Sequence, residues 1–222
     1  MPRVVDAMWG TVHLPVGVTD LATFRAWVRS EVLPEKLAAH FIDGDVWVDL
    51  SMGEAFSHNQ AKLAVTVGLT ALAAGSGMTF SDGMLFTNDE AGLGTEPDAM
   101  YVRLQSFESG RVRFAAGDTT GADATELVGS PDLVVEVVSP SSVDKDTEWL
   151  MPAYHDAGVG EYWLIDARGG ETWFDIYKHG PKGFVPSRRQ AGWVRTPLFG
   201  KQVRLVRRQV TARFYTFTLE SR

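Results

Sequence analysis

The sequence has no cysteine among its 222 residues, and this absence excludes several kinds of site. Structural disulfides, thiolate metal centres and a cysteine nucleophile are ruled out. There is also no apolar run of the roughly eighteen residues that a membrane-spanning helix needs. The chain does not start with a basic segment followed by an apolar one. Secretion and membrane insertion are therefore unsupported, and we expect a cytoplasmic protein.

Three well-known motifs are absent as well: a glycine-rich phosphate loop, a His-Glu-x-x-His zinc pair and a Gly-x-Ser-x-Gly nucleophile elbow. What remains is an ordinary globular composition, with 45% hydrophobic and 22% charged residues. The length predicts one domain over 1–222. We divide it into an N-terminal extension (1–40), a core (41–177) and basic C-terminal strands (178–222).

Charge is distributed unevenly along the chain. Residues 1–177 contain 10 Lys and Arg against 27 Asp and Glu, whereas residues 178–222 contain 11 Lys and Arg and a single acid, Glu220. The net charges of the two parts are −17 and +10. A basic section of this kind is suited to a polyanion such as DNA, although it could equally pair with the acidic body of the same chain.

The first half of the chain predicts two helices and a hairpin. A helix should start at Thr19-Asp20 and end near Pro34, because apolar residues recur there at helical spacing. Asp43-Gly44 lies between two apolar runs and predicts a hairpin turn. Ser57 is a candidate N-cap for a second helix that should end at Gly75.

The second half is dominated by strand patterns. We expect strands at 78–87, with a bulge or turn at Asp82-Gly83, and at 96–103, 162–166, 173–177, 203–206 and 214–217, and a loop insertion over 105–129. Residues 130–168 have the order strand, turn, helix, glycine, strand. These elements predict an α/β or mixed α+β fold with a mixed central sheet flanked by helices.

Glu136 is the most informative residue of this pattern, because a glutamate inside a valine-rich strand is costly to bury without a partner. Asp132 lies on the same strand face but about 13 Å away, too far to share one small metal ion. Asp98, at the start of the strand 98–103, is a better partner. If the two strands pair antiparallel, Asp98 and Glu136 become cross-strand neighbours that could hold Mg²⁺.

Together the motifs resemble a known family. They are Pro97-Asp98, then Pro131-Asp132-Leu-Val-Val-Glu136-Val-Val-Ser139-Pro-Ser, then Tyr154 to Asp166 with its Gly158-Val-Gly segment. This ordered set is similar to the Uma-two family of restriction-endonuclease-like proteins in the PD-(D/E)XK nuclease superfamily. Ile42-Asp-Gly44 and His58 match the same family.

The resemblance implies a restriction-endonuclease-like fold and a hydrolase that cuts DNA phosphodiester bonds with Mg²⁺ or Mn²⁺. The metal ligands would be Asp98 and Glu136. A catalytic lysine usually lies on the following helix, but the matching position here is Leu150, and Pro152 follows in what should be helix interior. Lys145 is the nearest spare cation. It would point away from the site on a regular helix, and could reach the site if 141–149 is a loop.

The remaining assignments stay open at this stage. Asp132 is either a catalytic or outer-shell residue or one that completes a turn. His58 is either a substrate-binding residue or polar surface, and Asp144 and Asp146 are N-caps or outer-shell partners of the metal. Two hypotheses for function follow: a Mg²⁺-dependent endonuclease, which could act as a homodimer, or a nuclease fold that no longer cuts and binds nucleic acid or a protein partner.

Overall fold

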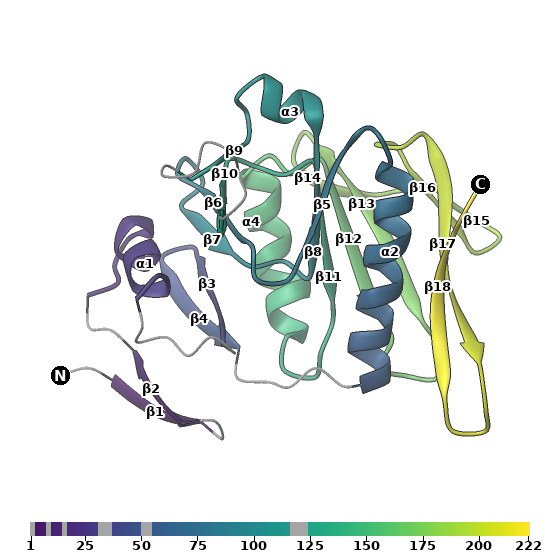
Figure 1. The fold of residues 1–222 in the computed structure, drawn as a ribbon, viewed down its shortest axis with the longest axis horizontal. Helices are drawn as coiled ribbons and strands as arrows, with labels where there is room; N and C mark the ends of the chain where they lie inside the picture. The colour runs from purple at the N-terminus through teal and green to yellow at the C-terminus, as the bar shows by residue number, and fades with distance from the viewer. Residues whose placement is uncertain (1–2, 8–9, 15–16, 31–36, 50–54, 116–123) are drawn as a thin grey trace.

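The structure is a computed structural model that describes residues 3–222 except 8–9, 15–16, 31–36, 50–54 and 116–123 (Figure 1). A six-stranded mixed sheet positions the site, in the order β14-β13-β12-β11-β8-β5. Its strands are β5 (Gly77–Ser81), β8 (Ala99–Arg103), β11 (Leu133–Val137), β12 (Glu161–Asp166), β13 (Trp173–Gly180) and β14 (Gly183–Pro186). Strands β11 and β12 are parallel, and their other neighbours are antiparallel.

Helices cover both faces of this sheet, α2 (Ala61–Ala73) on one and α4 (Leu150–Asp156) on the other. Figure 1 shows the sheet between the blue helix α2 and the green helix α4. Strand alternation explains the two cores: Leu133, Val135 and Val137 pack with α2, whereas Val134 packs with α4. Glu136 has the parity of Val134 and therefore belongs to the α4 face.

A second six-stranded sheet has the order β4-β3-β7-β6-β10-β9. Its strands are β3 (Ala38–Ile42), β4 (Asp45–Asp49), β6 (Leu85–Asn88), β7 (Leu93–Thr95), β9 (Arg113–Phe114) and β10 (Glu126–Val128). Helix α1 (Leu21–Val28) packs on it through Phe24, and its N-cap Asp20 forms a capping box with Thr23. Buried Glu126 forms ion pairs with Arg25 of α1 and with Arg29, the residue that ends this helix, so β10 and α1 are held together.

A four-stranded antiparallel sheet ends the chain: β15 (Arg189–Gln190), β16 (Trp193–Thr196), β17 (Lys201–Gln209) and β18 (Tyr215–Ser221). Val203 and Phe217 from its inner face join the core cluster of α2. Gly68 of α2 lies against Leu219 so closely that an added Cβ would be 2.5 Å from the leucine Cβ. The helix and β18 are therefore in intimate contact. Two shorter elements complete the fold, the hairpin β1 (Arg3–Ala7) with β2 (Gly10–Leu14) and the helix α3 (Leu104–Glu108).

Most of the predicted elements are present. The hairpin at Asp43-Gly44 is confirmed, and both residues adopt positive φ (51° and 84°), as a tight hairpin turn requires. The strands 162–166 and 173–177 pair as expected, and the parallel strands β11 and β12 are joined through a helical segment. The expectation of a mixed sheet flanked by helices is confirmed.

Four details of the prediction were wrong. The first helix ends at Val28, well before Pro34. The turn at Asp82-Gly83 is present, and Gly83 has φ 82°, but the segments on its two sides are strands of different sheets and not one strand 78–87. The expected loop 105–129 contains the buried strand β10. Ser57 is not an N-cap, because a π-helical segment, Ala55–Gln60 (η1), precedes α2.

In the described part of the chain, no helix combines the length and apolar character needed to cross a membrane.

Candidate active site

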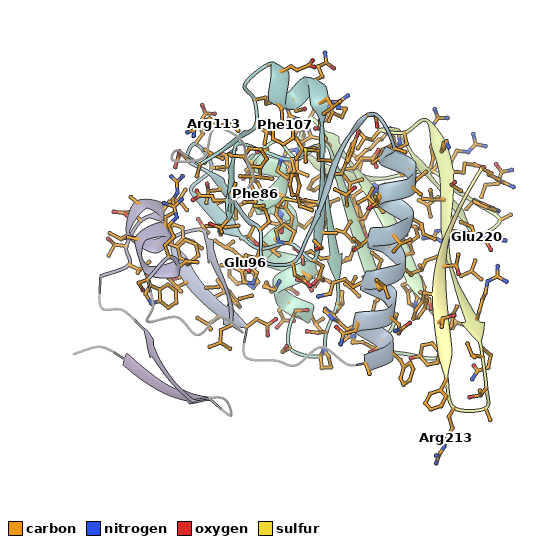
Figure 2. The ribbon with its side chains drawn as sticks, viewed as in Figure 1. Phe86, Glu96, Phe107, Arg113, Arg213 and Glu220 are labelled. Atoms are coloured by element: carbon orange, nitrogen blue, oxygen red, sulfur yellow. The ribbon has the colours of Figure 1, made fainter. Side chains whose placement is uncertain are left out.

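A cavity of about 350 Å³ opens where β8 begins and β11 ends, beside the start of α2. Its lining is strongly polar. The charged and histidine side chains in it are His40, Asp49, His58, Lys62, Asp82, Glu96, Asp98, Glu136, Lys145 and Asp146. Glu96, labelled in Figure 2, belongs to the segment between β7 and β8. This concentration of titratable groups in one hollow is typical of a functional site.

Asp98 and Glu136 meet in this cavity through strand pairing. The antiparallel register of β11 and β8 runs through Val134↔Met100 to Val135↔Ala99. One step further along the same register brings Glu136 opposite Asp98. The antiparallel pairing predicted from the sequence is therefore present, and both carboxylates face the same cavity.

Three groups hold Asp98. Its Oδ2 accepts a hydrogen bond from the backbone N–H of Val137 at 2.7 Å and lies 3.5 Å from His58 Nε2. Its Oδ1 accepts a hydrogen bond from Lys62 Nζ at 3.0 Å. Burial alone would raise the pKa of Asp98, but the contact with His58 and the charge of Lys62 lower it to about 2. Asp98 is therefore a carboxylate at neutral pH.

Glu136 is only 2% exposed, and its two oxygens have different partners. Tyr154 donates its hydroxyl to Oε1 at 2.6 Å, and Lys145 Nζ lies 3.9 Å from Oε2. Burial, together with the negative charges of Asp146 and Asp98, raises the pKa of Glu136 well above its usual range. The effect of Asp98 on this pKa reflects the proximity of the two carboxylates.

Lys145 reaches the cavity by a route that the sequence did not reveal. Residues Lys145–Trp149 form a π-helical segment (η2) that continues directly into α4, which is neither the regular helix nor the loop that the sequence left as alternatives. The N–H of Leu150 donates to the carbonyl of Lys145, a bond between residues five apart. In a π turn residues five apart are about one turn apart, so Lys145 and Leu150 lie on the same side of the helix. The predicted divergence of the two residues on a regular helix does not apply here.

The side chain of Lys145 is 10% exposed and lies between two acids. Its Nζ is 2.8 Å from Asp146 Oδ1 as well as 3.9 Å from Glu136. Burial opposes the charged form, but Glu136 and Asp146 outweigh it and raise the pKa of Lys145. Ser142 donates to the other oxygen of Asp146 at 2.5 Å. Asp146, the next residue of η2, thus holds the lysine ammonium in place.

Leu150 and Pro152 have structural explanations. Leu150 is fully buried in the core between α4 and the sheet, where it packs in the same cluster as Tyr154. Pro152 is the third residue of α4 and follows the π-helical segment η2, so the residue without an N–H lies close to the point where the hydrogen-bond pattern of the helix changes. Neither residue blocks the cavity.

Asp132 lies outside the cavity. Its carboxylate, 3% exposed, accepts hydrogen bonds from Arg103, Ser106 and Arg111 at 2.6–2.9 Å. All of these donors lie at the far end of β11, where α3 begins. The geometry therefore gives Asp132 the structural role that the sequence left open and does not support a catalytic one.

The sequence reasoning missed Lys62, which contacts Asp98 and also lies 2.9 Å from Asp82. Its spacing from His58 was a usable signal, because residues four apart share a helix face. Both side chains do reach Asp98, His58 from η1 and Lys62 from the start of α2. Glu96 was also missed, and burial raises its pKa to about 7.

The cavity offers two carboxylates, Asp98 and Glu136, as donors for a divalent metal. Across the described ranges, no group of three or more His, Asp or Glu side chains is arranged to hold a metal ion. Mg²⁺, however, keeps several waters and needs only one or two carboxylates together with substrate phosphates. Asp98 and Glu136 supply two such oxygen donors in a hollow open to water. The residues therefore fit Mg²⁺ or Mn²⁺ better than a fully protein-enclosed metal.

Comparisons with known proteins agree with this fold. No curated protein matches the chain. Among solved structures, the chain is similar to a crystal structure from Anabaena variabilis described as "a putative nuclease belonging to DUF820". The TM-score is 0.60 at 19% identity, covering 84% of this chain and 92% of the other. At this identity the likeness establishes the fold.

The sequence itself matches a family model over residues 21–204. That family is Uma2, described as "Putative restriction endonuclease". The match covers the helix α1, both six-stranded sheets and the whole cavity lining. The resemblance inferred from the carboxylate motifs is confirmed, and this chain belongs to the Uma2 family of restriction-endonuclease-like proteins.

Proposed function

We propose that this protein is a metal-dependent endonuclease that hydrolyses phosphodiester bonds in DNA. The observation that carries the proposal is the convergence of Asp98, Glu136 and Lys145 in one water-accessible cavity. Family membership favours nuclease chemistry, and the geometry of the cavity suggests which residues perform it.

Asp98 and Glu136 would hold Mg²⁺ or Mn²⁺. The ion, when bound, stabilises the charge that develops on the phosphate and activates a water. Asp98 is prepared for this role because the N–H of Val137 fixes one of its oxygens. Tyr154 fixes one oxygen of Glu136 and leaves the other directed toward Lys145. The two carboxylates thus have defined orientations before any ion arrives.

Lys145 would act as the catalytic cation. Its ammonium is near Glu136, where it can orient a water or contact a phosphate oxygen, and Asp146 restrains its position. A long side chain on a mobile loop would lose more conformational freedom on reaching this position. The π turn therefore supports Lys145 in the role that Leu150 cannot fill, and it favours the active enzyme over a nuclease fold without catalytic activity.

A cleavage assay tests the proposal. Supercoiled plasmid and single-stranded DNA are incubated with Mg²⁺ or Mn²⁺ and with wild type, Glu136→Gln or Glu148→Gln. The last is a matched control, since Glu148 is exposed and lies on the same helical segment. We expect cleavage by wild type and Glu148→Gln and at least a hundredfold loss in Glu136→Gln, in line with removal of a metal ligand. Equal cleavage by all three, or none by any, would remove the nuclease assignment.

A further inference from the structure

The outer face of the C-terminal sheet carries a row of arginines. Arg195 pairs with Gln202 across β16 and β17, Arg204 with Glu220 and Arg208 with Thr216 across β17 and β18. Gln202 also exchanges backbone hydrogen bonds with Arg222. All these positions share one face, because the residues between them, such as Val203 and Phe217, face the core.

We call Arg195, Arg204, Arg208, Arg213 and Arg222 the arginine ladder. Arg204 and Arg222 lie over the ring of Trp193, with guanidinium carbons 4.5 and 4.4 Å from its centroid. Stacking of this kind holds a guanidinium flat and limits its freedom. Glu220, the one acid of residues 178–222, pairs with Arg204 and Arg208 at 2.7 and 2.5 Å. One carboxylate cannot neutralise five cations, so the ladder keeps a net positive charge.

The ladder leads toward the candidate active site. Strand β17 extends from Arg204 past Arg208 to a tip at residues 210–214, where Arg213 points away from the molecule (Figure 2). Near this tip, Phe214 and Tyr215 contact Phe56 of η1, with ring centroids 5.6 and 5.3 Å apart. The same segment η1 carries His58, which lines the cavity. In Figure 1 the hairpin runs beside α2 and its tip reaches beyond the start of that helix.

We propose that the arginine ladder binds the sugar–phosphate backbone of a nucleic acid whose reacting phosphodiester lies in the cavity. The inference rests on the proposed function, because that function supplies the phosphodiester. Arginine is suited to this task, since its planar guanidinium binds phosphate oxygens in pairs. Eight of the eleven cations in 178–222 are arginines. Strand β17 has nine residues, or roughly 30 Å, which matches about nine base pairs of duplex at 3.4 Å each.

The surface is largely separate from the part that defines the family. The family model ends at residue 204, whereas Arg208, Arg213 and Arg222 follow that point. The ladder therefore adds a binding surface to the matched core. The other polyanion that could occupy it is the acidic part of a second copy, residues 1–177, whose net charge is −17. A free nucleic acid is favoured because the hairpin tip contacts Phe56 of η1, the segment that also carries His58 of the cavity, where a phosphodiester is expected.

Fluorescence anisotropy of a labelled 20-base-pair duplex tests the proposal, measured with EDTA so that no cleavage occurs. The ladder variant is Arg195→Gln/Arg208→Gln/Arg213→Gln. Its matched control is Lys178→Gln/Lys182→Gln/Arg188→Gln, which removes the same charge from exposed positions of the same basic section. We expect the ladder variant to bind at least tenfold more weakly at 100 mM KCl. The slope of log affinity against log salt concentration should be smaller in magnitude by about two to three, because each lost phosphate contact contributes about 0.9 to that slope.

If the two variants lose DNA affinity equally, net charge alone governs binding and the proposal is overturned. Unchanged DNA affinity in the ladder variant would overturn it as well. Sedimentation of the same samples reports the second-copy alternative. A salt-sensitive dimer that only the ladder variant loses, with DNA affinity unchanged, would replace the proposal. Hydrolysis of bis(4-nitrophenyl) phosphate with Mn²⁺ keeps the two questions apart, because this small diester needs only the cavity. The ladder variant should hydrolyse it at the wild-type rate, whereas failure of wild type would count against the proposed function and not against the ladder.

Discussion

Lys62→Met should make this protein bind divalent metal more tightly. The ammonium of Lys62 is 3.0 Å from Asp98 Oδ1, an oxygen that the proposed metal ion needs. An ion that binds there must displace the lysine, so the wild-type affinity includes the loss of that contact. Removing the ammonium leaves Asp98 free to bind the ion.

The size of the effect follows from the geometry. A hydrogen bond between charged groups contributes about 1.5–3 kcal/mol. The side chains of Lys62 and Asp98 are 18% and 14% exposed, so water weakens the pair and favours the lower end of that range. About 1.4 kcal/mol corresponds to a factor of ten. We therefore expect the Kd for Mn²⁺, measured by calorimetry without DNA, to fall about tenfold.

A variant of Asp82 can show whether the metal ion displaces Lys62 or whether removing the lysine charge is enough to strengthen metal binding. Asp82 holds the same ammonium at 2.9 Å, yet it is 59% exposed and well screened by water. If Lys62 withdraws to Asp82 when metal binds, Asp82→Asn should weaken metal binding in wild type and have little effect in the Lys62→Met background. The exposed Lys201→Met serves as the control for total charge.

Two results would refute this reasoning. An unchanged or higher Kd in Lys62→Met would show that the lysine does not compete with the ion. Additive effects of Lys62→Met and Asp82→Asn would show that both act through charge alone.

Three further predictions concern single residues. Asp132→Ala should lower the free energy of unfolding by about 2–3 kcal/mol, because Arg103 and Arg111 lose a buried partner but stay partly in water. The same variant should bind Mn²⁺ with unchanged affinity in calorimetry. Burial raises the pKa of Glu161 in the folded state, so the free energy of unfolding of wild type should fall as pH rises above the ordinary pKa of 4.5 and through the raised one. Urea titrations from pH 4 to 8 should show a smaller fall for Glu161→Gln than for wild type. An equal pH dependence of the two proteins would contradict this. Tyr154→Phe should reduce kcat for DNA cleavage about tenfold with DNA affinity preserved, since it removes the bond that orients Glu136; an equal loss in affinity would argue against a positioning role.

The sequence was sufficient to pair Asp98 with Glu136. Strand alternation determines which side chains share a face, and antiparallel pairing of the two strands then places Asp98 opposite Glu136. The buried acid in a valine-rich strand was informative because burial without partners is so unfavourable. Its partners, Tyr154 and Lys145, lie on a helical segment whose register the strand pattern does not contain.

Lys145 shows where sequence reasoning stops. Placing it required knowledge that one turn of the helix is π, and such a turn depends on the surroundings of the whole segment. Tertiary context also decided β10, whose Leu127 and Val128 are flanked by polar and glycine residues that suggested a loop. At residues 78–87 the turn residues Asp82-Gly83 were visible, but the sequence did not show that the chain changes sheets there.

The measurement that tests the central claim most directly is DNA cleavage by Lys145→Met under single-turnover conditions. The sample is first shown by calorimetry to bind Mn²⁺, which establishes that the site is folded. We predict that the variant cleaves at least a hundredfold more slowly than wild type, since it lacks the cation that the π turn brings to Glu136. Cleavage at the wild-type rate by metal-loaded Lys145→Met would contradict the assignment of Lys145 as the catalytic lysine.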